Sequence, residues 1–304
     1  MKIKKIGAIL LVVVMLFAFT ACGKKEETAL RIYDGAFSEQ KLLYRMVKLL
    51  VEEHTDLPVE FRDVMSGINI YRELTADNCD LMVSYDGTLL TTFLHLDSSD
   101  VPEGERLYDF VNRKMMEAED CYLLDMIGLN NTYAIGVPQE IADRYNLDTI
   151  SDLAQVADQL EFGAEHDFFT EEGSAKFGPF STFYGLNFKG VRQIDVNLKY
   201  AAVESGNIDV MVVYTTDGLN KKAQLKVLED DQNYFPDYNG ALLVRQELFE
   251  RVEDIAPNLK EVLNMLGDSC NNEEMTDLTY AVDVEGESPD DVARQFLQSK
   301  GLIS

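Results

Sequence analysis

Apolar positions along the chain follow two patterns, short continuous runs and a spacing of three to four residues, and the two patterns alternate. Residues 38–50 show the helical spacing, because Leu43, Val47 and Leu50 fall on one face, and we expect Ser38 to cap this helix. The short runs predict strands at 29–33, 59–61, 80–85 and 122–127, with helices at 38–50, 70–74 and 108–117 and another beginning at 89. Strands that alternate with helices predict a mostly parallel α/β sheet.

The strand pattern restarts near residue 133, and two strands of the chain are built alike. Residues 78–85 read N-C-D-L-M-V-S-Y and residues 207–214 read N-I-D-V-M-V-V-Y, so each apolar run ends in a tyrosine, Tyr85 or Tyr214. In open α/β sheets, ligands bind at the carboxyl ends of the strands. Two such edges that face each other would form a cleft between two lobes, which is a common place for a ligand.

The N-terminus has the pattern of an export signal. Three lysines within the first five residues precede an apolar run at 6–19, which is followed by Thr20, Ala21 and Cys22. The run is too short to span a membrane comfortably. A cysteine directly after small residues is typical of a bacterial lipobox, although Phe19 stands where leucine is usual. We therefore expect a signal peptide at 1–21, lipidation of Cys22, and a tether at 22–28 that holds the protein on the extracytoplasmic face of the membrane.

Composition and charge limit the classes of partner and cofactor. With 304 residues, 46% of them hydrophobic, the chain can bury a large core in one domain or two. Its net charge of −27 argues against nucleic acid, whose phosphates it would repel. Cys79, Cys121 and Cys270 match no zinc-binding spacing, so we expect buried thiols, no metal and no cofactor.

Several segments, in their order and spacing, resemble a known family. They are F-S-E-Q at 37–40, Y-D-G-T at 85–88, N-N-T-Y-A at 130–134, T-I-S-D-L at 149–153, G-A-E-H-D-F at 163–168, Y-G-L at 184–186, Y-T-T-D-G at 214–218 and F-P-D-Y at 235–238. From about residue 32 to 303 the chain is similar to the substrate-binding lipoproteins of ABC importers for quaternary ammonium compounds, the glycine betaine, carnitine and choline binders.

The resemblance implies an α/β, periplasmic-binding-protein-like (type II) fold of two lobes joined by a hinge, with a ligand cleft. Residues 29–134 plus 239–304 would form lobe I, and 135–238 would form an inserted lobe II. The chain would cross between the lobes near 134–136 and near 236–240. The expected partners are a small ligand and the permease and ATPase subunits of the importer, with the receptor itself a monomer.

The resemblance also implies a cage of aromatic rings. A quaternary ammonium has no N–H, so proteins hold it on aromatic faces, each worth roughly 0.5–2 kcal/mol. The positions that match the family's cage are Tyr85, Tyr133, Tyr214 and Tyr238. Tyr85 and Tyr214 are also the two tyrosines that the strand pattern places at sheet edges. For each ring, the alternative is a half-buried side chain at the end of a sheet.

The far end of the ligand would meet polar groups. Gln40 and Thr88 match the positions that hold the carboxylate in family members that accept betaines. Asp86 stands where threonine is usual, and it could either cap the following helix or accept the hydroxyl of choline in the pocket. The second role would favour choline without excluding glycine betaine or carnitine.

The sequence lacks the motifs of the common hydrolases. It contains no G-x-S-x-G, H-E-x-x-H or P-loop. The triplet Glu165, His166 and Asp167 suggests a structural hydrogen-bond role more than a metal or acid–base site. We therefore predict a receptor for osmoprotectant or nutrient uptake and no enzymatic activity. The alternatives are a receptor of the same fold for another small cation or an amino acid, and a lipoprotein hydrolase acting on choline-containing compounds.

Overall fold

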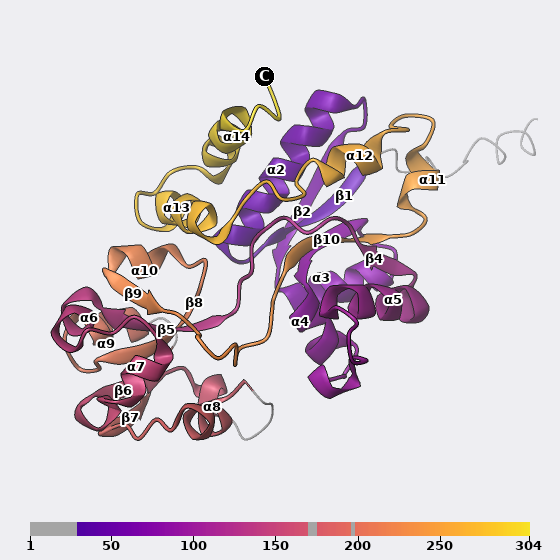
Figure 1. Cartoon of the computed structure of the whole chain (residues 1–304). Helices are drawn as coiled ribbons and strands as arrows, with labels where there is room; N and C mark the ends of the chain where they lie inside the picture. The colour runs from indigo at the N-terminus through magenta and orange to yellow at the C-terminus, as the bar shows by residue number, and fades with distance from the viewer. Residues whose placement is uncertain (1–28, 170–174, 196–197) are drawn as a thin grey trace, which may run out of the picture.

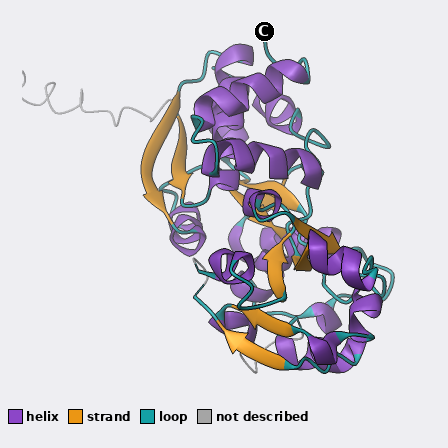
Figure 2. Ribbon diagram, turned by 90° about the vertical axis from the view of Figure 1, so that its left-hand side faces the viewer, coloured by secondary structure: helices purple, strands orange, loops and turns teal. Residues whose placement is uncertain are grey.

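The computed structural model describes residues 29–169, 175–195 and 198–304, which form two lobes (Figure 1). The predicted signal peptide, the lipidated Cys22 and the tether lie outside the described residues. Seen from the side, helices pack around the strands in both lobes (Figure 2). Among the described helices, none has the length and apolar character needed to cross a membrane.

The first lobe contains two small sheets. Strands β1 (Leu30–Gly35) and β2 (Val59–Met65) pair in parallel. Strand β10 (Gly240–Arg245) lies between β3 (Leu81–Tyr85) and β4 (Cys121–Leu123) and is antiparallel to both. The helical segments of this lobe are α2 (Ser38–His54), α3 (Gly67–Thr75), α4 (Asp86–Thr88) continued by a π-helical turn at Leu89–Phe93, α5 (Leu107–Glu119), α11 (Leu248–Val252), α12 (Leu259–Asn264), α13 (Asn272–Asp283) and α14 (Pro289–Ser299).

The second lobe is built on one five-stranded sheet in the order β7-β6-β8-β5-β9. Its strands are β5 (Tyr133–Pro138), β6 (Glu161–Ala164), β7 (Gly190–Gln193), β8 (Val210–Tyr214) and β9 (Leu225–Leu228). Its α-helices are α6 (Gln139–Tyr145), α7 (Ile150–Ala154), α8 (Phe177–Tyr184), α9 (Lys199–Glu204) and α10 (Gly218–Lys222).

The prediction of a mostly parallel sheet is wrong. The parallel pairs are β1 with β2 and β6 with both β7 and β8, whereas β5 is antiparallel to β8 and β9, and β10 is antiparallel to β3 and β4. The reason is that β5 and β10 are the strands that enter a lobe from the other lobe. They arrive from the cleft and therefore run opposite to strands that end at the cleft.

Each lobe has its own apolar core. In the first lobe, α2 runs through the core, with Leu43, Met46, Val47 and Leu50 fully buried. The first lobe also holds the three described cysteines, which are buried free thiols as predicted. Ser38 begins α2 instead of capping it, and its hydroxyl donates to Asp283.

The two segments that cross between the lobes lie side by side. Asn130 bridges to Asn239 in antiparallel fashion, and its side-chain oxygen accepts from the N–H of Tyr238 at 2.7 Å. The Thr132 hydroxyl donates to the carbonyl of Pro236 at 2.8 Å. Residues 134–136, which were predicted to cross, already lie in β5 of the second lobe, so the chain crosses a few residues earlier.

The lobes also touch through helices α10 and α13, which lie next to each other in Figure 1. Met275 of α13 belongs to the apolar core of the first lobe. Leu219 of α10 packs against a buried apolar cluster of the second lobe. The hydroxyl of Thr279 donates to the carbonyl of Thr216 at 2.9 Å. Gly218 approaches α13 so closely that an added Cβ would lie 2.3 Å from the backbone nitrogen of Tyr280.

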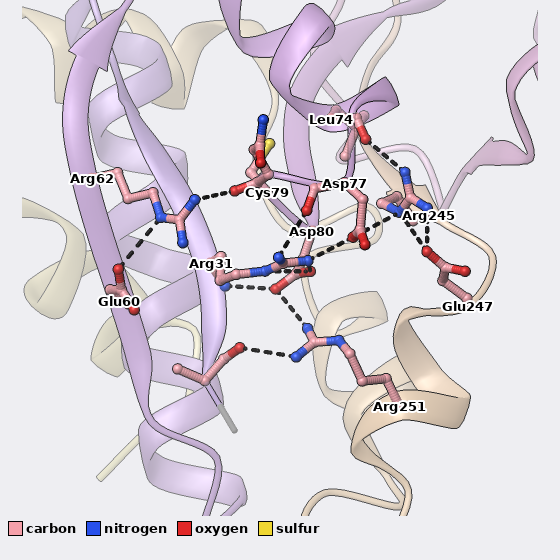
Figure 3. Close-up of polar contacts among 12 residues, drawn as sticks. Arg31, Glu60, Arg62, Leu74, Asp77, Cys79, Asp80, Arg245, Glu247 and Arg251 are labelled. Atoms are coloured by element: carbon pink, nitrogen blue, oxygen red, sulfur yellow. Dashed lines mark hydrogen bonds and ion pairs between the residues drawn. The ribbon is translucent and has the colours of Figure 1, made fainter. Parts of the chain in front are cut away.

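A buried ion-pair network fixes the end of β3 that is remote from the crossing segments (Figure 3). The carboxylate of Asp80, just before β3, accepts from the backbone N–H of Arg31 at 2.7 Å and pairs with the Arg31 guanidinium at 2.6 Å. The guanidinium of Arg251 pairs at 2.7 Å with Oδ2 of Asp80, the oxygen that also accepts from the Arg31 N–H. Because the start of β3 is held in this way, its last residue, Tyr85, emerges at a defined position.

Candidate ligand-binding site

Two of the predicted cage tyrosines are neighbours in the second lobe. Tyr133 begins β5 and Tyr214 ends β8, and the register of the two antiparallel strands pairs them. Their ring centroids are 5.3 Å apart with an interplanar angle of 30°. Tyr214 is 36% exposed, which is unusual for a large aromatic side chain at the end of a buried strand.

These two rings form part of the wall of a cavity of about 620 Å³. The rest of the wall is polar apart from one isoleucine and consists of Glu165, His166, Gln193, Ile194 and Asp195. Behind the cavity, the ring of Phe168 meets Tyr133 edge-on at 5.4 Å. Since Phe168 is fully buried, this contact holds the Tyr133 ring in a fixed orientation.

Ammonium groups of the protein itself lie over both rings. The Lys199 nitrogen is 5.2 Å from the centroid of Tyr214, and the Lys176 nitrogen is 5.8 Å from the centroid of Tyr133. The Lys199 side chain is only 1% exposed and pairs with Glu165 at 3.3 Å. Both rings therefore take part in cation–π contacts with lysines of the chain itself.

Tyr85 stands at the carboxyl end of β3 and is tied to the first turn of α2. Its hydroxyl donates to Oε1 of Glu39, and the Asn131 amide donates to the same oxygen at 3.1 Å. Glu39 is only 6% exposed. Burial raises the pKa of the Glu39 carboxyl, and its neighbours Thr216, Tyr85 and Asn131 oppose that rise. Glu39 thus joins the first lobe to the first crossing segment.

Tyr238 lies in the second crossing segment, against α4. A Cβ added at Gly87 would lie 2.8 Å from Cε2 of Tyr238, so this contact requires glycine at position 87. Burial raises the pKa of the Tyr238 hydroxyl. Thr88, the next residue of α4, is half-buried. Through Asn131, whose N–H donates to the carbonyl of Tyr238 at 3.0 Å, the Tyr238 region is also linked to Glu39.

Asp86 does not cap α4, which was one of its two predicted roles, and its predicted contact with the ligand stays a prediction. It is fully buried; Oδ1 accepts from the backbone N–H groups of Gly87 and Asn239, and Oδ2 accepts from the Asn239 amide, all at 2.8 Å. Helix α4 begins at Asp86 itself and has no side-chain cap. Burial raises the pKa of Asp86 to about 6. We therefore assign Asp86 to the second crossing segment, which it holds against α4.

Gln40 is buried next to Glu39 at the start of α2. A Cβ at Gly35 would lie 2.4 Å from the Gln40 Cβ, so the end of β1 packs directly on this side chain.

The structure thus brings Tyr133 and Tyr214 into direct contact and connects Tyr85 to them through Glu39 and Asn131. Tyr238 packs against Gly87 of α4, the helix that also contains Thr88.

Sequence reasoning missed Glu39, Asn131 and Lys199. Glu39 and Asn131 stand inside segments that carry the family resemblance, directly before Gln40 and two residues before Tyr133. Their position beside predicted site residues was a usable signal. Lys199 gave no such signal, because only the packing of α9 on β8 brings it over Tyr214.

The chain matches, over residues 29–299, the family model OpuAC, described as the substrate binding domain of the ABC-type glycine betaine transport system. It belongs to this family. The protein is thus a substrate-binding component of an ABC transporter and not an enzyme. Proteins of this kind work outside the cytoplasm, at the membrane, together with permease and ATPase subunits.

Curated relatives cover nearly all of the chain. The ergothioneine transport permease/ergothioneine binding protein EgtU of Helicobacter pylori (strain G27) is 33% identical over 280 residues, 91% of this chain and 48% of EgtU. The chain thus spans about half the length of EgtU. The glycine-betaine-binding protein of Pseudomonas aeruginosa is 30% identical over 292 residues, 93% of this chain and 91% of that protein. The carnitine transport binding protein OpuCC of Listeria monocytogenes is 29% identical over 283 residues, 92% of this chain and 90% of OpuCC.

Solved structures confirm the predicted two-lobe α/β fold. A crystal structure described as a glycine betaine/carnitine/choline ABC transporter superposes with a TM-score of 0.81 at 29% identity, covering 90% of this chain and all of that one. Lactococcal OpuAC, in its closed-liganded conformation with glycine betaine, superposes with a TM-score of 0.52 at 14% identity, covering 90% of this chain and 96% of that one.

Proposed function

We propose that this protein is a lipid-anchored, monomeric receptor that captures a small quaternary ammonium compound in a tyrosine cage and delivers it to an ABC importer. The observation that carries the proposal is the pair Tyr133 and Tyr214, whose adjacent rings line a cavity and take part in cation–π contacts. A quaternary ammonium needs such faces, because it has no N–H with which to form a hydrogen bond.

Closure of the lobes would complete the cage. Tyr85 and Tyr238 come from the first lobe and the second crossing segment, and a ligand that touches rings from both sides favours the closed form. The closed-liganded conformation of lactococcal OpuAC supports such a movement. Family members associated with glycine betaine, carnitine and ergothioneine support the ligand class, since all three compounds carry a trimethylammonium group.

Calorimetric titration with choline, glycine betaine, carnitine and ergothioneine tests this proposal. We expect at least one of these compounds to bind, and Tyr214→Ala or Tyr133→Ala to weaken that binding by about tenfold or more, since one lost face with its packing is worth about 1.4 kcal/mol or more. Tyr145→Ala is the control, because Tyr145 is a partly buried tyrosine of the same lobe outside the cavity wall. Unchanged affinity in folded Tyr214→Ala protein would rule out the cage.

The anchor is a separate part of the proposal. It rests on the sequence at 1–22 alone, where an apolar run ends in small residues and Cys22. Incorporation of labelled lipid into the wild-type protein, and its loss in Cys22→Ala, is the corresponding test.

A further inference from the structure

Three hydrogen-bond acceptors around the first turn of α2 are buried without a donor. They are Oε2 of Glu39, Oε1 of Gln40 and Oδ1 of Asn131, none of which has a hydrogen-bond partner among the described residues. Glu39 and Gln40 are only 6% and 8% exposed. A buried acceptor without a partner costs about 1–3 kcal/mol, and folded proteins contain few of them. Because the Asn131 amide donates to Glu39, at least two of these oxygens lie in one cluster, which indicates that a donor comes from outside the chain.

These acceptors lie where the predicted cage segments meet. Glu39 accepts from the hydroxyl of Tyr85 and from the amide of Asn131. Asn131 stands two residues before Tyr133, and Thr216, which neighbours Glu39, stands two residues after Tyr214. The orphan oxygens therefore lie on or beside the segments that carry the rings of Tyr85, Tyr133 and Tyr214.

The chemistry of these oxygens limits the ligand. The trimethylammonium head has no N–H or O–H, so the missing donor must be on the rest of the molecule. A bare carboxylate offers only acceptors, and Glu39 would meet it oxygen to oxygen. We propose that the site selects quaternary ammonium compounds whose arm carries an O–H or N–H donor, and that Oε2 of Glu39 receives this donor as the specificity-determining group.

This inference rests on the proposed function and sharpens it. Choline and carnitine carry a hydroxyl, and ergothioneine carries ring N–H groups, whereas glycine betaine has no donor. The first three compounds should therefore bind more tightly than glycine betaine.

The decisive comparison uses choline and its O-methyl ether, which differ only in whether the hydroxyl can donate. Titration calorimetry with the full-length protein should give choline at least tenfold tighter binding than the ether. In Glu39→Gln, which keeps the shape of the side chain, the ratio should fall to about threefold or less. The steric effect of the added methyl group is common to both proteins and cancels in the comparison.

Glu52→Gln is the matched control, because Glu52 lies exposed on the same helix, away from the first turn. It should leave the ratio unchanged. An ether that binds wild-type protein as tightly as choline would overturn the inference, and so would an unchanged ratio in Glu39→Gln. Should Glu39→Gln fail to fold, as judged by circular dichroism, a wild-type ratio below tenfold still overturns the inference. If no quaternary ammonium compound binds wild-type protein, it is the proposed function that fails.

Discussion

At the residue scale, Asp86 shows how this chain differs from its family pattern. The sequence alone left two roles for it, a helix cap or a ligand contact, because both are common for an aspartate at the end of a strand. The structure gives it a third role, as the acceptor for two N–H groups and one amide around Asn239. No sequence pattern could reveal this, since Asn239 lies 153 residues further along the chain.

The buried carboxyl of Asp86 should make stability depend on pH. Burial raises its pKa from 3.8 to about 6, so the folded protein holds this proton more tightly than the unfolded chain does. The resulting stabilisation is complete below about pH 3.8 and is lost as the pH rises through 6. The difference in unfolding free energy, wild type minus Asp86→Asn, should therefore fall by about 3 kcal/mol between pH 3.5 and 6.5 in urea titrations.

Asp97 provides a control of opposite sign. The hydroxyl and N–H of Ser99 lower the pKa of its exposed carboxyl, so its stabilising effect is lost as the pH falls. The difference between wild type and Asp97→Asn should therefore rise with pH over the acidic range. A pH-independent difference for Asp86→Asn would contradict our account of that residue.

At the element scale, local patterns predicted strands β1 to β4 and helices α2, α3 and α5, but not how the strands pair. The helical spacing around Leu43 and the apolar run before Tyr214 are local signals, and both elements are present. Neither β10 nor α13 has a local pattern that predicted it. Strand β10 follows a long excursion through the second lobe, and its antiparallel place between β3 and β4 depends on contacts more than 100 residues apart in sequence.

The same limit applies to the candidate site. The resemblance supplied the four tyrosines and Gln40 as residue types at matching positions. It could not supply the unpartnered oxygens of Glu39 and Asn131 or the ammonium of Lys199 over Tyr214, because burial and orientation depend on how the lobes pack. Those details are the ones that distinguish one quaternary ammonium ligand from another.

The contact between α10 and α13 should be sensitive to a single methyl group. In Gly218→Ala, the added Cβ would lie 2.3 Å from the Tyr280 nitrogen, so the two helices must separate. We expect a loss of about 1–3 kcal/mol in unfolding free energy, measured by urea denaturation. Gly178→Ala in α8 is the control: its Cβ meets nothing within 4 Å, and it should stabilise the protein by about 0.5–1 kcal/mol. Equal stability of Gly218→Ala and wild type would refute this close contact.

At the scale of the whole molecule, two separate cores share few contacts. The lobes meet at the paired crossing segments, around Glu39, and at the α10–α13 contact, where Lys221 and Asp277 also pair at 2.7 Å. The apolar clusters of the two lobes do not merge, because each packs around its own sheet. Each lobe can therefore open or unfold with only a modest effect on the other.

A ligand held by rings from both sides should couple the lobes. By scanning calorimetry, the ligand-free protein should unfold in two overlapping transitions or in one broadened transition. At a ligand concentration 100 times the dissociation constant, ligand binding stabilises the folded protein against unfolding by about 2.7 kcal/mol. Because both lobes must be folded to bind, the lobe of lower stability gains most and the transitions should merge into one. Tyr214→Ala at the same ligand concentration should show a smaller shift, since it removes one of the two rings that the second lobe contributes. If ligand moved only one transition and left the other in place, the ligand would be bound by a single lobe, and the cage would not extend across the cleft.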